Sequence, residues 1–222
     1  MKLLQRQQLM ILASQLLLAS LAFGQNYKVA GLGPPPAGQI PAALQEALQP
    51  QGVQVVNDQG GTLVELWLSK SVSISSNPSN SPDIVFGALS EGEFVGMVHF
   101  PSQATDFRGQ AIKPGFYTVR YGLIPQDGNH MGVNPTRDAF VLSPAAADTN
   151  LGTALKFDDL VKLSRQASGT PHPQLLVGAQ VNGDVFPSVV NDDQGHWNLQ
   201  VKAPGTSGDY PIAITVVGKW QG

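Results

Sequence analysis

The alternation of side chains that is typical of a β-strand is clearest in one stretch of this chain: Lys113-Pro114-Gly115-Phe116-Tyr117-Thr118-Val119-Arg120-Tyr121-Gly122-Leu123. Pro114 and Gly115 suit the two central positions of a turn, because proline presets φ and glycine accepts a positive φ. After this turn every second side chain, beginning with Tyr117, points to one face, and Arg120 points to the other. The stretch therefore predicts a turn followed by a strand over residues 116–123.

Strand patterns also occur on both sides of this stretch. Residues 53–56 and 62–69 flank a turn of residues that tolerate positive φ, so they predict a hairpin. Residues 184–190 and 196–202 predict a second hairpin around the turn at 191–195. Further strands are predicted at 83–89, 93–100, 138–142 and 211–217. The chain is therefore predicted to be all-β, with antiparallel sheets arranged like a sandwich and two short accessory helices.

The two accessory helices are predicted from segments with helical spacing. Residues 41–49 begin with a proline and stop shortly before a glycine, which favours a short helix. Residues 157–167 carry Asp158 and Asp159 in the first turn and Gly169 after the end, as the helix dipole and a C-terminal cap favour. The residues predicted to form the buried stripe of this helix are Leu160, Leu163 and Ala167.

The first 24 residues have the features of a cleavable signal peptide. Lys2 and Arg6 supply a positive start, and an apolar run extends over residues 9–23. Small residues at its end predict cleavage before Gln25. We therefore expect an exported bacterial protein, periplasmic or extracellular.

The residues that remain after cleavage, 25–222, are predicted to form a single β-rich domain, with any subdivision near residues 146–170. The chain has 13 basic and 16 acidic residues, and two of the basic ones lie in the leader. The mature protein then carries 11 basic residues against 16 acidic ones, a net charge of −5. This balance gives no electrostatic basis for binding nucleic acid, and no later segment predicts a membrane span. The absence of cysteine excludes thiol nucleophiles and thiolate metal sites.

A polar loop, residues 125–135, follows the strand at 116–123. Functional residues often lie on loops that a rigid scaffold holds, so this region is the candidate binding site. The candidate ligand-binding residues are Arg120, Tyr117, Asp127, Asn129, His130 and Arg137.

The leading hypothesis is a non-catalytic exported module that binds a small polar ligand, a glycan or an envelope protein. A cleft lined by Trp67, Tyr117 or Tyr121 beside Arg120 would support this hypothesis, and full burial of the three rings would contradict it. Alternatively, the arginines of this region form ion pairs that fix long connections.

Two further hypotheses remain open. The first is a metal-dependent or hydrolytic enzyme that uses residues 127–138, which requires Asp127, His130 and either His172 or His196 to lie close together. The second is a structural envelope component with an exposed sheet edge or apolar patch. H-E-x-x-H and G-x-S-x-G motifs are absent from the sequence, so it gives no reason to expect a metal or another cofactor. The acidic segment 191–193 lacks the spacing of a calcium loop and is interpreted as a hairpin turn.

One segment carries a resemblance to known proteins. It begins at Phe107-Arg108-Gly109-Gln110-Ala111-Ile112, runs through the strand at 116–123 and continues through Pro125-Gln126-Asp127-Gly128-Asn129-His130. It resembles uncharacterised secreted proteins of soil bacteria such as Acidobacteria, over residues 50–175. The unit Pro114-Gly115-Phe116-Tyr117-Thr118 is also similar to the end of many bacterial extracellular β-sandwich domains. The resemblance implies a secreted β-rich protein and brings no known activity or catalytic residue.

Overall fold

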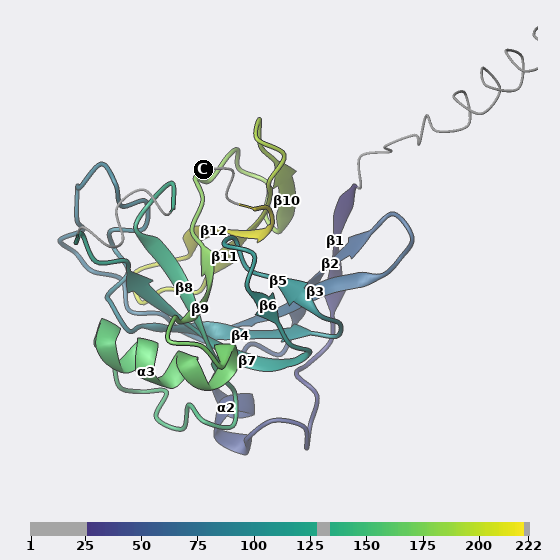
Figure 1. Ribbon diagram of the computed structural model, residues 1–222, viewed down its shortest axis with the longest axis horizontal. Coiled ribbons are helices and arrows are strands. Elements are labelled where there is room, and N and C mark those ends of the chain that lie inside the picture. The colour runs from purple at the N-terminus through teal and green to yellow at the C-terminus, as the bar shows by residue number, and fades with distance from the viewer. Residues whose placement is uncertain (1–25, 128–133, 220–222) are drawn as a thin grey trace, which may run out of the picture.

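The computed structural model describes residues 26–127 and 134–219 (Figure 1). The strands of this part are β1 (Tyr27–Leu32), β2 (Gly52–Asn57), β3 (Thr62–Leu68), β4 (Phe94–Phe100), β5 (Ala104–Thr105), β6 (Ala111–Ile112), β7 (Gly115–Leu123), β8 (Asp138–Pro144), β9 (Gln174–Val177), β10 (Ser188–Asn191), β11 (Trp197–Ala203) and β12 (Tyr210–Val217). The helices are α2 (Ala42–Ala47) and α3 (Phe157–Ser168).

The strands form three antiparallel sheets. The largest has seven strands in the order β1-β2-β3-β4-β7-β8-β9, and the others are β10-β11-β12 and β5-β6. The predicted all-β class with antiparallel sheets and two accessory helices is confirmed.

The seven-stranded sheet is the middle layer of the fold. One of its faces packs on the three-stranded sheet through a core in which Val119 and Phe140 meet residues such as Leu199. The other face is covered by α2 through Leu44 and by α3 through Leu160. Figure 1 shows the two helices on one side of the large sheet and β10–β12 on the opposite side. Both faces of the central strands are therefore buried.

The strand predicted at residues 116–123 is confirmed as β7, in the middle of the large sheet between β4 and β8. Tyr117, Val119 and Tyr121 face the core shared with the three-stranded sheet. Arg120 lies on the helix side, where its guanidinium carbon is 5.9 Å from the centroid of the Phe94 ring. The alternation in the sequence therefore separates two buried layers and does not separate core from solvent.

Most of the other predicted elements are confirmed. The two predicted hairpins are β2–β3 and β10–β11, although β10 begins only at Ser188. The strands predicted at 93–100, 138–142 and 211–217 are β4, β8 and β12.

The strand predicted at residues 83–89 is wrong. The backbone N–H groups of Val85 and Phe86 donate to the carboxylate of Asp138, at 2.8 and 2.9 Å, so no neighbouring strand receives them. Leu89 forms only an isolated bridge with Ile74. The apolar residues of this segment enter the core from an irregular backbone that a buried carboxylate holds in place.

Two strands of the large sheet were not predicted. β1 pairs with β2 along its whole length, but Gly31 within it and the prolines from Pro34 onward are residues that disfavour a strand. β9 is buried at all four of its residues, so it shows no alternation of apolar and polar side chains. A strand that is buried on both faces gives no period-two signal.

The helix predicted at residues 157–167 is confirmed as α3, and Gly169 caps it in the left-handed region with φ 65°. Its buried stripe differs from the prediction, because Ser164 is buried together with Leu160 and Ala167 while Leu163 is half-exposed. The Ser164 hydroxyl donates to the Leu142 carbonyl at 2.5 Å and accepts from the Gln174 N–H at 2.8 Å. This serine therefore connects α3 to β8 and β9.

Replacing Ser164 with alanine is expected to lower the free energy of unfolding by about 1 to 3 kcal/mol, because the buried Gln174 N–H loses its acceptor. Urea denaturation measures the change. The substitution Gln166→Ala, on the exposed side of the same helix, is the matched control and should change stability by less than about 0.5 kcal/mol. Equal effects of the two substitutions would contradict the connecting role of Ser164.

The chain passes from the seven-stranded sheet to the three-stranded sheet directly after β9. The Gly178 N–H donates to the Asp138 carbonyl of β8 at 2.9 Å, and the Ala179 N–H donates to the Ala213 carbonyl of β12 at 3.0 Å. The two sheets are thus joined by main-chain hydrogen bonds at one corner. This corner carries the candidate site.

Candidate functional site

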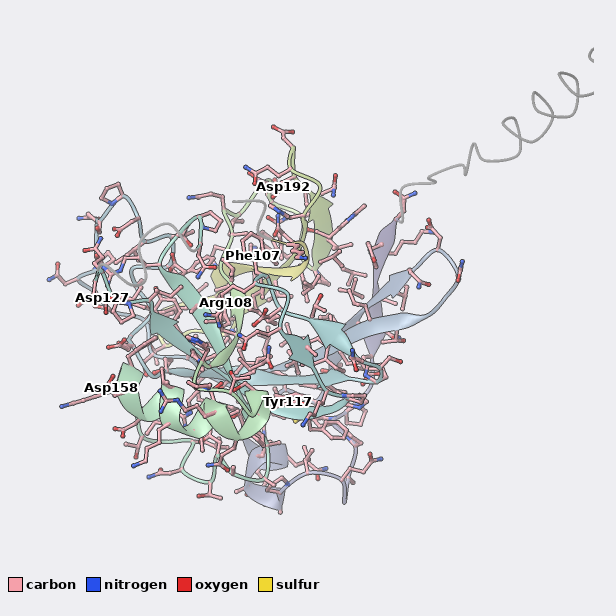
Figure 2. All side chains as sticks on the ribbon, in the orientation of Figure 1. Phe107, Arg108, Tyr117, Asp127, Asp158 and Asp192 are labelled. Carbon is pink, nitrogen blue, oxygen red and sulfur yellow. The ribbon has the colours of Figure 1, made fainter. Side chains whose placement is uncertain are left out.

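A pocket of about 300 Å³ opens where the end of β9 meets the three-stranded sheet. Most of its lining side chains are polar, and one aromatic ring joins them. The side chains that matter for its chemistry are Phe107, Thr136, Asp192, His196, Asn198 and Thr215. Figure 2 shows Asp192 on the β10–β11 turn with Phe107 below it, on the segment between β5 and β6. We call this hollow the His196 pocket.

The turn between β10 and β11 holds Asp192 in place. The Asp192 N–H donates to the His196 carbonyl at 2.9 Å, and the Gly195 N–H donates to the Asp192 carbonyl at 3.0 Å. One carboxylate oxygen of Asp192 accepts from the backbone N–H groups of Gln194 and His196, both at 2.9 Å. The interpretation of residues 191–193 as part of a hairpin turn is therefore confirmed.

The second carboxylate oxygen of Asp192 lies 3.0 Å from Nδ1 of His196. The carboxylate fixes this imidazole, because a proton on Nδ1 can be donated to it. Neutral His196 then carries a lone pair on Nε2. The residue is 6% exposed, and among residues 26–127 and 134–219 its buried Nε2 has no hydrogen-bond partner. A buried acceptor without a donor costs about 1 to 3 kcal/mol, so this nitrogen is unusual.

The imidazole ring is also confined by neighbouring groups. The Phe107 ring meets it edge-on, with centroids 5.1 Å apart. Phe107 is itself positioned because Asp106 accepts from the N–H groups of Arg108 and Gln110 and from the side chain of Gln174 on β9. His196 therefore belongs to a rigid wall of the pocket.

A chain of hydrogen bonds extends across the pocket from the paired Asp192 and His196 side chains, which we call the Asp192–His196 dyad. The Thr215 hydroxyl donates to Oδ1 of Asn198 at 2.7 Å, and Nδ2 of Asn198 lies 3.5 Å from the Asp192 carboxylate.

The pKa of Asp192 lies below its usual value. Partial burial alone would raise this pKa, but hydrogen bonds from the His196 and Gln194 N–H groups and the nearby His196 ring lower it by more. Asp192 is thus an anion at neutral pH.

The charge of the pocket is negative. Asp192 and Asp193 both line it, and none of the lining residues in the described part of the chain is a lysine or an arginine. An anionic ligand would meet repulsion here, whereas a neutral or cationic ligand would not. The pocket can therefore accept hydrogen bonds from a ligand through the two carboxylates.

The structure gives Arg120, a predicted ligand-binding residue, a structural role. Arg120 is 1% exposed. Its five N–H donors are all used: two by the Asp148 carboxylate, at 2.7 and 3.0 Å, and three by the carbonyls of Gly92, Asn150 and Thr153. No donor is left for a ligand, so the alternative interpretation of this arginine as an ion pair that fixes a long connection is confirmed.

The three rings expected to line a cleft beside Arg120 are buried. Trp67 is 2% exposed, Tyr117 is 6% exposed and Tyr121 is fully buried. Trp67 donates to the Gly33 carbonyl, and Tyr117 donates to the Lys113 carbonyl, each at 2.8 Å. The expected cleft lined by these rings beside Arg120 is therefore wrong, and so is the binding module in the form that relied on this cleft. The rings are buried because the helices cover the second face of the sheet and the small sheet covers the first.

The other predicted site residues do not join into one site within the described residues. Arg137 donates through Nε to the Ile124 carbonyl at 2.8 Å, and the same nitrogen lies 3.9 Å from the Asp83 carboxylate. Asp127 is exposed, and Figure 2 shows it well separated from Tyr117. Asn129 and His130 lie outside the described residues.

The described histidines do not gather into a metal site. His99 lies on β4 with Nδ1 2.7 Å from the Glu65 carboxylate and stacks on Phe116, whereas His196 pairs with Asp192. His172 is exposed before β9. Within residues 26–127 and 134–219, no three His, Asp or Glu side chains could hold a metal ion together. The version with Asp127 and His130 involves a residue outside that range.

The sequence pattern did not reveal the Asp192–His196 dyad. Asp192 was interpreted only as a turn residue, and His196 was considered only as a partner of Asp127 and His130. The sequence offered one signal: Asp192 and His196 are four residues apart across a predicted tight turn. Such a turn reverses the chain and brings the two side chains next to each other. The Phe107 wall and Thr215 come from distant segments, and local spacing could not have identified them.

Within the described ranges, no helix has both the length and the apolar character needed to cross a bilayer. Comparisons with protein-family models, with curated proteins and with solved structures found no match. The resemblance to secreted proteins of soil bacteria stays a prediction. Function is therefore inferred from the geometry of the pocket alone.

Proposed function

We propose that this protein is a non-catalytic binding module that takes a small neutral, hydroxyl-bearing ligand, of the size of a single sugar unit, into the His196 pocket. The observation that carries the proposal is the buried Nε2 atom of His196. His196 lines the pocket, and this nitrogen has no donor from the described protein. A ligand hydroxyl would supply that donor and remove the cost of leaving the nitrogen unpaired.

The size and lining of the pocket support a ligand of this class. A volume of about 300 Å³ is at the small end of the range for ligand sites. Carboxylate, amide and hydroxyl groups surround one aromatic ring, so the pocket offers several acceptors and one apolar wall. The negative charge of Asp192 and Asp193 disfavours phosphates and carboxylates.

The hydroxyls of the pocket favour binding over nucleophilic catalysis. A carboxylate–histidine pair can activate a nucleophile that donates to Nε2. The Thr215 hydroxyl donates to Asn198 instead, and the Thr136 hydroxyl donates to the Gly178 carbonyl at 3.2 Å. Both hydroxyls are therefore committed to other acceptors.

The proposed location of this module is outside the cytoplasm. The leader-like pattern of residues 1–24 supports export. A domain of this size can fold without disulfides, so the absence of cysteine is compatible with that location. Envelope glycans or their fragments would be within reach of such a module.

Titration calorimetry with glucose, galactose, mannose and N-acetylglucosamine should detect binding of at least one of these sugars. The substitution His196→Phe keeps an aromatic ring beside Phe107 but removes both nitrogens, and it should weaken binding by about tenfold or more. His172→Phe, at an exposed loop position, is the matched control and should bind as the unchanged protein does.

A second measurement covers the case in which His196→Phe does not fold. In the unchanged protein, the ¹⁵N resonance of His196 Nε2 should move when the sugar that binds is added, because the nitrogen gains a donor. Binding without movement of this resonance would reject the His196 pocket as the site, and the absence of binding by all four sugars would reject the ligand class.

A further inference from the structure

A second pocket lies at another junction of the two sheets, and it shares no lining residue with the His196 pocket. It has a volume of about 280 Å³ and lies between the ends of β2 and β3 and the end of β11, with the segment before β10 on one side. Its apolar lining includes Val53, Leu66, Leu68, Phe186, Pro187 and Val201. We call it the Lys202 pocket.

Lys202 provides the charge of this pocket. Its ammonium lies 5.1 Å from the centroid of the Phe186 ring, a distance at which the ring attracts the cation. Within residues 26–127 and 134–219, this ammonium has no carboxylate within ion-pair distance. The ring thus holds a cation beside an apolar hollow, and no described anion neutralises it.

The remaining polar groups of the pocket are two amides. Gln49 and Gln51 both line it. Gln51 is exposed, and the Gln49 amide nitrogen lies 3.5 Å from the Lys70 carbonyl. None of the lining residues in the described chain is acidic. The charge of the Lys202 pocket is therefore opposite to that of the His196 pocket.

We infer that the Lys202 pocket binds a small amphiphilic carboxylate, whose apolar body fills the hollow and whose carboxylate pairs with Lys202. Apolar walls favour a ligand body that leaves water, and the single ammonium selects an anionic head. The volume limits the body to about one or two aromatic rings or a short alkyl chain. This inference does not depend on the ligand proposed for the His196 pocket.

Calorimetric titration with 2-naphthoate and with its neutral amide, 2-naphthamide, tests this inference. Both molecules have the same apolar body, so the difference between them isolates the charge. The unchanged protein should bind the carboxylate about fivefold more tightly than the amide, as expected for a partly exposed charge pair. Equal affinities, or the absence of binding by the carboxylate, would overturn the inference.

Two variants locate the binding. Lys202→Met keeps the apolar stem and should abolish the preference for the carboxylate, whereas Leu68→Gln should weaken both ligands. Lys202 is exposed, so its replacement should leave the thermal midpoint nearly unchanged. A preference that survives Lys202→Met would also overturn the inference.

Discussion

Replacing Arg120 with methionine is expected to lower the free energy of unfolding by about 3 to 5 kcal/mol, because the substitution leaves the Asp148 carboxylate buried without its cation. Arg120 and Asp148 are both almost fully buried, and their side chains share two hydrogen bonds. The same change also removes the donors of the Gly92, Asn150 and Thr153 carbonyls. Urea denaturation followed by circular dichroism measures the loss.

A double-mutant cycle separates the ion pair from the loss of packing. Asp148→Leu alone should also destabilise the protein, since it leaves the guanidinium unpaired. The double variant Arg120→Met with Asp148→Leu should be less destabilised than the sum of the two single variants, by about 1 to 3 kcal/mol. Additive effects would mean that the two side chains are not energetically coupled, which contradicts a buried ion pair. Arg120→Lys should remain destabilising, because an ammonium cannot reproduce the five-donor geometry.

Replacing Asp138 with alanine is expected to destabilise the protein by about 3 kcal/mol or more, because three donors, two of them buried, lose the carboxylate that accepts from them. Asp138 is fully buried. Its carboxylate accepts from the Val85 and Phe86 N–H groups and from the Tyr121 hydroxyl, the last at 2.7 Å. Burial, and then the hydrogen bond to Asp138, raise the pKa of Tyr121, so this hydroxyl stays protonated and donates.

The matched control removes only one of these three hydrogen bonds. Tyr121→Phe keeps the ring in the core and should cost about 1 kcal/mol. Thermal and urea denaturation of the two variants compare the costs. A Tyr121→Phe variant as unstable as Asp138→Ala would mean that the backbone of residues 85–86 does not depend on the carboxylate. In that case the irregular segment would owe its position to Phe86 packing alone.

The elements that the local sequence could predict are those whose side chains follow a single helix or strand repeat, or whose ends carry typical turn or capping residues. β7 alternates, the β2–β3 hairpin has its turn residues, and α3 has acidic residues at its start and Gly169 at its end. The faces of these elements were less predictable. Leu163 is half-exposed although the apolar pattern placed it inside, because Ser164 connects α3 to β9.

Features that depend on distant contacts could not be predicted. Arg120 looked like a binding residue because its partner Asp148 is 28 residues away, and the sequence does not show that the two meet. The backbone of residues 85–86 is fixed by a carboxylate more than 50 residues away. The His196 pocket is assembled from five separate segments, and only its Asp192–His196 pair is local.

The backbone of Gly178 lies directly against Asp138 and Phe86, so the core and the His196 pocket form a single unit in local unfolding. A Cβ atom at this glycine would lie 2.6 Å from Asp138 Cβ and 3.0 Å from the Phe86 ring, and Gly178 also lines the pocket. Only one residue of backbone therefore separates the pocket from the buried carboxylate. Any opening that exposes Asp138 must also dismantle the pocket wall, so an occupied pocket would slow amide hydrogen exchange at Val85 and Phe86.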